Sequence, residues 1–209
     1  EAYIEGGGAP RKTVATGNGE GVVLRAVDNS SILAIAGTLS VAVGIGASTG
    51  VGGSMGASVN INTVRNTIDT HISDTKVVSA GIVDLDSVSN ATIWSLAIAG
   101  SVGVGVGKPA ATTTGGGAGG QGGTGVGVAI SGAVTVNVVD NRTVSYIDQG
   151  SHVTSLAGGA VSLDAKDNTQ IMADAGGVSL AVGSGERTGV GVAIGGSVAV
   201  NVVSNETLA

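Results

Sequence analysis

The sequence predicts an all-β protein, a parallel β-solenoid (β-helix) of three large tandem modules with long strands. The first observation behind this prediction is composition. The chain has 209 residues, of which 39 are Gly, none is Phe and one is Trp, so its 42% of hydrophobic residues are mostly Val, Ile, Leu and Ala. Branched aliphatic residues with abundant glycine favour strands joined by turns over helices. The other two observations are a long internal repeat and a strict alternation of large and small side chains.

The repeat is clearest in three stretches that align without gaps: GVGGSMGASVNIN (50–62), GVGVAISGAVTVN (125–137) and GVGVAIGGSVAVN (189–201). Three further sets of similar segments flank them. The first set is 32–44, 95–107 and 171–183. The second is the octapeptides that end at Asn29, Asn90 and Asn168, and the third is 2–5, 70–73 and 145–148. Such self-similarity predicts modules that stack on one another. We place the modules at residues 1–68, 69–144 and 145–209.

Two differences in length separate the modules. The second module carries a glycine-rich segment, KPAATTTGGGAGGQGGT (108–124), which is predicted to be a surface loop. Our alignment also gives the second module two extra residues between Asn90 and SLAIAG. An insertion of two residues keeps every side chain on its own face of a strand, as a β-ladder requires.

Alternation within 125–137 divides the side chains into two faces. Val126, Val128, Ile130, Val134 and Val136 share one face, and Gly, Ala, Ser, Thr and Asn occupy the other. We expect the bulky face to supply the core. The small face then packs against another sheet or another copy, or it lines the inside of a narrow solenoid. Two pairings remain open, parallel coils or antiparallel hairpins across the short loops.

Net charge, hydropathy and targeting signals limit the classes of partner that we expect the chain to bind. The net charge is -6 with no basic patch, so no nucleic-acid partner is expected, and no apolar stretch reads as a membrane-inserted helix. The chain opens without a signal peptide and ends at nearly the phase of the repeat at which it begins. This phase predicts either modules from a longer array or a subunit whose ends continue each other.

Repeated asparagines are the main candidate residues. Stacked at equivalent positions they are expected to form amide ladders, a structural role that we assign to Asn62, Asn137, Asn201, Asn66, Asn141 and Asn205. Asn-x-Ser/Thr patterns also make candidate glycan acceptors of Asn29, Asn90, Asn141 and Asn205. We favour the structural interpretation because the repeat alone generates these patterns.

Catalytic and metal-binding patterns fail one by one. Asp84 and Asp86 share a strand face but lack the aromatic platforms of a sugar cleft, since Trp94 stands alone. His71 takes the position of Tyr3 and Tyr146, which indicates packing, and no Cys accompanies it for zinc. The sequence therefore predicts no catalytic residue, no metal, no cofactor and no enzyme.

The phrases GVGVAIGGSVAVNVVSNETLA, SYIDQGSHVTSLAGGAVSLDAKDN and ATIWSLAIAGSVGVGVG resemble the repeat arrays of giant bacterial surface proteins of the filamentous-adhesin, haemagglutinin and leukotoxin types. The resemblance covers essentially the whole chain. It implies export, a β-helical filament and adhesion or matrix work at the bacterial cell surface.

The leading functional expectation is thus a structural repeat segment of a secreted extracellular filament or surface adhesin. It would act by stacking and self-association, head-to-tail or lateral, with a cell-surface glycan or matrix as a further partner. The alternative is a glycan- or protein-binding adhesive module that uses the 108–124 loop.

Overall fold

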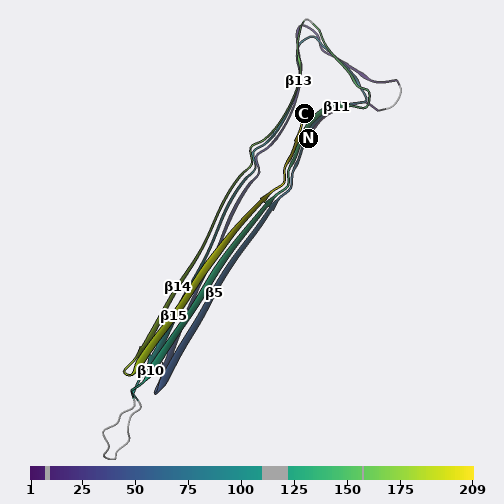
Figure 1. The fold of residues 1–209 in the computed structure, drawn as a ribbon. Coiled ribbons are helices and arrows are strands. Elements are labelled where there is room, and N and C mark those ends of the chain that lie inside the picture. The colour runs from purple at the N-terminus through teal and green to yellow at the C-terminus, as the bar shows by residue number, and fades with distance from the viewer. Residues whose placement is uncertain (8–9, 110–121, 157) are drawn as a thin grey trace, which may run out of the picture.

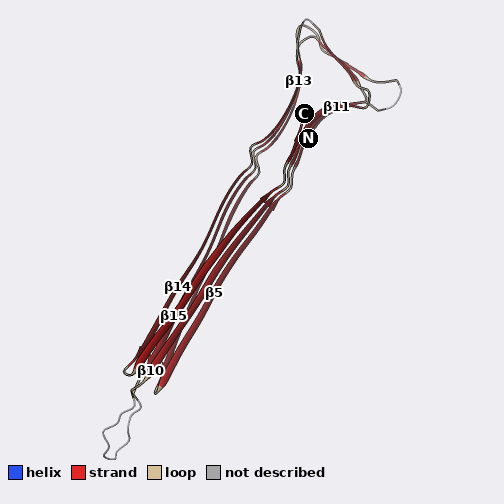
Figure 2. Cartoon of the chain, viewed as in Figure 1, coloured by secondary structure: helices blue, strands red, loops and turns tan. Residues whose placement is uncertain are grey.

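The computed structural model describes residues 1–7, 10–109, 122–156 and 158–209. Throughout these residues the regular structure is all strand and contains no helix (Figure 2). The predicted all-β class is therefore confirmed.

The chain winds through three coils of five strands each. Coil 1 contains β1 (Ala2–Glu5), β2 (Thr13–Ala15), β3 (Val22–Asp28), β4 (Ser31–Gly46) and β5 (Thr49–Val64). Coil 2 contains β6 (Thr67–Ser73), β7 (Lys76–Ser79), β8 (Val83–Ser89), β9 (Thr92–Gly107) and β10 (Thr124–Val139). Coil 3 contains β11 (Arg142–Asp148), β12 (His152–Ser155), β13 (Val161–Asp167), β14 (Gln170–Gly185) and β15 (Thr188–Val203), and β16 (Glu206–Leu208) follows.

Equivalent strands of successive coils pair side by side and parallel. The sheets have the orders β1-β6-β11-β16, β12-β7-β2, β13-β8-β3, β14-β9-β4 and β15-β10-β5. Every pairing joins repeat-equivalent residues, as where Asn137 of β10 lies between Asn62 and Asn201. The parallel prediction holds, and the antiparallel hairpin alternative is wrong because β4 and β5 belong to different sheets.

The coils are drawn out into a long blade and a small head (Figure 1). The blade consists of the sheets β4/β9/β14 and β5/β10/β15, whose strands of 16 residues reach about 50 Å. The head has a three-sided outline and holds the three shorter sheets, and both chain ends lie near β11 (Figure 1).

The blade reverses the predicted core. Its small side chains point inward, where Ala97, Ala99 and Ala133 are buried, and its large aliphatic side chains point outward, with Leu39 75% and Met55 71% exposed. The physical reason is the closeness of the two sheets. A Cβ atom added to Gly105 of β9 would overlap the backbone carbonyl of Val126 of β10, so no bulky residue fits between them. The prediction that the bulky face supplies the core is wrong for the blade.

An aliphatic core does exist in the head. Val22, Ile72, Val77, Val83 and Leu85 form one buried cluster, to which each of the three head sheets contributes. A second cluster, Val64, Ala91, Ile93 and Val139, lies where the head meets the blade. Each fully buried aliphatic side chain of this kind stabilises the fold by about 1.5–3 kcal/mol.

One of the four repeat alignments is corrected by the register. Ile32 pairs with Ile93, and Ile171 pairs with the same residue, so residues 32–44 match 93–105 rather than 95–107. The two extra residues in the second module therefore do not exist. A slip of two residues preserves the alternation and leaves Ala and Gly facing Ala and Gly, which is why the sequence pattern did not reveal it.

The predicted module limits at 68/69 and 144/145 fall inside β6 and β11. Residues 108–123 join β9 to β10, so Thr124 of the predicted loop 108–124 belongs to β10, and residues 110–121 lie outside the described residues.

Candidate functional site

A ladder of side-chain amides crosses the three coils on the inner face of the blade. Asn62 donates its amide N–H to Oδ1 of Asn137 at 2.8 Å, and Asn137 donates in turn to Oδ1 of Asn201 at 2.8 Å. Asn137 is completely buried. The donors all point from coil 1 towards coil 3, so this ladder has a direction.

A second amide ladder runs the opposite way. Asn168 donates its amide N–H to Oδ1 of Asn90 at 3.0 Å, and Asn90 donates to Oδ1 of Asn29 at 2.9 Å. Sequence reasoning treated Asn29 and Asn90 only as glycan acceptors and missed this ladder. The signal was present, since the octapeptides of the second flanking set all end in these asparagines.

The set Asn66, Asn141 and Asn205 binds backbone instead. Oδ1 of Asn141 accepts the N–H of Asn66 at 3.1 Å, and Oδ1 of Asn205 accepts the N–H of Asn141 at 3.0 Å. The amide nitrogen of Asn66 also donates to Asp28 at 2.7 Å, which ties the bend after β5 to the end of β3. These residues fix the point at which the blade joins the head.

The candidate glycan acceptors differ in accessibility. Asn29 is exposed, and Asn90 and Asn205 are half-buried. Asn141 is 1% exposed, and its amide nitrogen donates to Ser89 and Thr169, so this fold has no room for a glycan there. Glycosylation at the other three stays a prediction.

A stack of three rings follows the coils on the head. His71 lies between Tyr3 and Tyr146, with ring centroids 5.1 and 5.0 Å away and interplanar angles of 4° and 11°. The carboxylate of Asp69 contacts Nδ1 of His71 at 2.6 Å. Loss of hydration and then the charges of Asp69 and Asp148 raise the pKa of Tyr146 above 10.0. His71 thus occupies the packing position that its alignment with the tyrosines predicts.

Ion pairs also join neighbouring coils. Arg25 of coil 1 meets Asp86 of coil 2 at 3.2 Å, and Arg11 meets Asp74 at 3.3 Å. Each pair is solvent-exposed on at least one side and contributes no more than about 1 kcal/mol. The pairs favour the observed register of the coils, because each pair forms only when the coils stack in this alignment.

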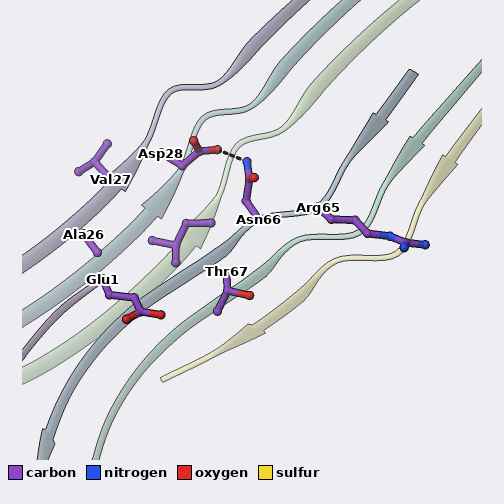
Figure 3. A pocket seen from close by; sticks show the side chains of 8 residues that line it. Glu1, Ala26, Val27, Asp28, Arg65, Asn66 and Thr67 are labelled. Atoms are coloured by element: carbon purple, nitrogen blue, oxygen red, sulfur yellow. Dashed lines mark hydrogen bonds between the residues drawn. The ribbon is translucent and has the colours of Figure 1, made fainter. Parts of the chain in front are cut away.

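A shallow pocket of about 300 Å³ opens on the end face of coil 1 (Figure 3). Its lining comes from three places in the chain: Glu1, Ala26, Val27, Asp28, Arg65, Asn66, Thr67 and Ile68. The amide of Asn66 and the carboxylate of Asp28 lie across it and are hydrogen-bonded (Figure 3). On the coil 1 side β1 pairs with β6 only from Thr70 onward, so the pocket lies beside Thr67, Ile68 and Asp69, which pair with β11 on their other side.

The described ranges were also searched for metal-binding clusters and membrane-spanning helices. They contain no group of three or more His, Cys, Asp or Glu side chains placed to hold a metal ion. Nor does any helix in them have the length and apolarity that a bilayer crossing requires. Comparison with known proteins adds nothing to this picture, because no family model, no curated protein and no solved structure matches the chain.

Proposed function

We propose that the chain is a structural repeat segment of a secreted extracellular filament or surface adhesin, and that it works by stacking and self-association. The observation that supports this is the open end of every ladder. In three sheets a full-length strand of coil 1 (β3, β4 or β5) is one edge and a full-length strand of coil 3 (β13, β14 or β15) is the other. Unpaired parallel edges are templates for further strands.

The ladders favour continued stacking over an isolated particle. The register between coils 1 and 2 is repeated between coils 2 and 3 along all 16 residues of β10. In solenoids each repeat contacts only its neighbours, so the stability of the array grows with each added coil. A fourth coil would meet the same geometry that the third meets.

Blade and ladder chemistry also favour a structural role over catalysis. The conspicuous polar groups of the inner blade, such as Asn60, Asn62 and Asn137, are engaged with one another or with backbone. The extracellular and bacterial parts of the proposal rest on the sequence resemblance. The alternative of an adhesive loop at 108–124 stays a prediction, because residues 110–121 lie outside the described residues.

Electron microscopy and fibre diffraction of the purified chain test the proposal. Filaments are expected with an axial reflection near 4.8 Å and a subunit repeat of about 14 Å, three strand spacings. A particle that stays monomeric in light scattering across a hundredfold concentration range would refute stacking. Antibody labelling of intact source cells tests the surface location, and labelling only after lysis would overturn it.

A further inference from the structure

The two end faces of the solenoid are complementary in detail. Building on the proposed function, we propose that a second copy of this chain docks head-to-tail, with the coil 1 face of one copy on the coil 3 face of the other. In this arrangement β16 of the copy that presents its coil 3 face fills the pocket beside Thr67, Ile68 and Asp69 of the copy that presents its coil 1 face.

Register is the first argument. On the coil 3 face, β16 pairs with Arg142–Val144 and leaves residues 145–148 of β11 uncovered. On the coil 1 face, β1 pairs with residues 70–73 of β6, which are the equivalents of 145–148. The three residues of β16 and the four of β1 together therefore make one strand as long as β6 or β11.

The pocket supplies the second argument. Thr67–Asp69 of one copy are the equivalents of the Arg142–Val144 segment to which β16 already binds. A strand placed in the pocket at the spacing of parallel neighbours would bind main chain on both sides. Glu206 of that strand would also come near the exposed side chain of Arg65, which lines the pocket.

Direction is fixed by the amide ladders. At the coil 3 face, Oδ1 of Asn201 accepts a hydrogen bond from Asn137, and the amide N–H groups of Asn201 point to no further asparagine of the ladder. At the coil 1 face, Asn62 donates one amide N–H to Asn137, and its Oδ1 accepts from no further asparagine of the ladder. Head-to-tail docking brings that donor to that acceptor. The opposite ladder matches as well, with Asn29 as donor and Asn168 as acceptor. A reversed copy would oppose Asn201 to Asn201, donor to donor.

Charge and ring stacking agree with this direction. Asp164 of coil 3 occupies the position that Asp86 has in coil 2, and Arg25 pairs with Asp86 within the chain. The Arg25 of a docked copy would therefore lie over Asp164. Its Tyr3 would likewise lie over Tyr146 and continue the ring stack.

Disulfide trapping between single-cysteine variants tests the direction. The chain has no cysteine, and Thr49, Thr124 and Thr188 are register equivalents in coils 1, 2 and 3. Parallel neighbours lie about 4.8 Å apart, within the Cα separation that a disulfide accepts. Mixing Thr49→Cys with Thr188→Cys under mild oxidation is expected to give mixed 49–188 dimers at least tenfold in excess of either homodimer. Thr124→Cys, which is flanked on both sides within its own chain, is the matched control and is expected to give no dimer with either variant.

The outcomes separate the two proposals. Homodimers of Thr188→Cys as the main product would overturn the direction while leaving stacking intact, and so would filaments that give no 49–188 product. No assembly of any kind would refute the proposed function itself. A synthetic peptide of residues 203–209 tests the pocket: it is expected to shorten filaments several-fold, whereas a scrambled peptide is expected not to. Equal filament lengths with both peptides would show that β16 does not dock there.

Discussion

Gly105 on β9 and Val126 on β10 lie back to back across the blade, with the carbonyl oxygen of Val126 where a side chain of residue 105 would begin. Backbone therefore touches backbone at this level, and the thickness of the blade is set by main-chain atoms.

Gly105→Ala is expected to destabilise the fold by about 1–3 kcal/mol or more, because the two sheets must separate to admit one methyl group. Gly132→Ala is the matched control on the outer face, where the nearest atom to an added Cβ is the carbonyl oxygen of Gly196 at 3.9 Å. The control should gain about 0.4–1 kcal/mol through the less flexible unfolded chain. Urea unfolding midpoints measure both, and equal midpoints would contradict the close packing.

Asn137→Ala is expected to cost about 2–4 kcal/mol, because it removes two hydrogen bonds and leaves Asn62 without its acceptor inside the blade. Asn201→Ala removes only one of these bonds, at an exposed position of coil 3, and should cost about 1 kcal/mol or less. Denaturant titration of the pair tests the ladder. A cost at 201 that equals the cost at 137 would mean that the central amide has no special weight.

The outward aliphatic faces should bind an apolar dye such as ANS in the native state. Val41, Val59 and Val198 are 53–61% exposed. Changing all three to Thr is expected to lower dye fluorescence while changing stability by no more than about 0.5 kcal/mol per site. Fluorescence titration with unfolding curves checks this. A loss of several kcal/mol would show that these side chains are packed after all.

Alkaline pH should destabilise the fold through two groups. Loss of hydration at Tyr146 and the hydrogen bond from Lys166 to Asp164 raise the pKa of each side chain above its usual value of 10.0 and 10.5. A folded-state pKa above the unfolded value gives a contribution that is complete below the unfolded pKa and is lost as pH rises through the folded pKa. Stability is therefore expected to decline above about pH 10.

The variants Tyr146→Phe and Lys166→Met each remove one of these titrations, and the slope of stability against pH above 10 should flatten in both. Thermal unfolding at half-unit steps from pH 8 to 11.5 measures the slope. Slopes identical to that of the unchanged chain would remove these two groups from the explanation.

Much of this architecture could be predicted from the sequence repeat. Alternation and self-similarity predicted long strands, parallel coils and the positions where Asn62, Asn137 and Asn201 meet. Alternation alone did not say which face is inside, because a Val/Gly pattern is the same whichever side is buried. The inside was decided by how closely the two sheets approach, which glycines facing backbone permit.

The close approach inside the blade also governs how its duplicated copies drift apart. The inner row Gly44, Gly105 and Gly183 is identical in all three coils. The outer row at the same sheets holds Ile35, Leu96 and Asp174, an aliphatic-to-acid replacement. At these two rows a change from an aliphatic to an acidic side chain stands on the outside, whereas the inner row is glycine throughout, because backbone of the facing sheet occupies the place of a side chain. A lineage of such modules can therefore diversify its surface coil by coil while its inner glycine pattern stays recognisable.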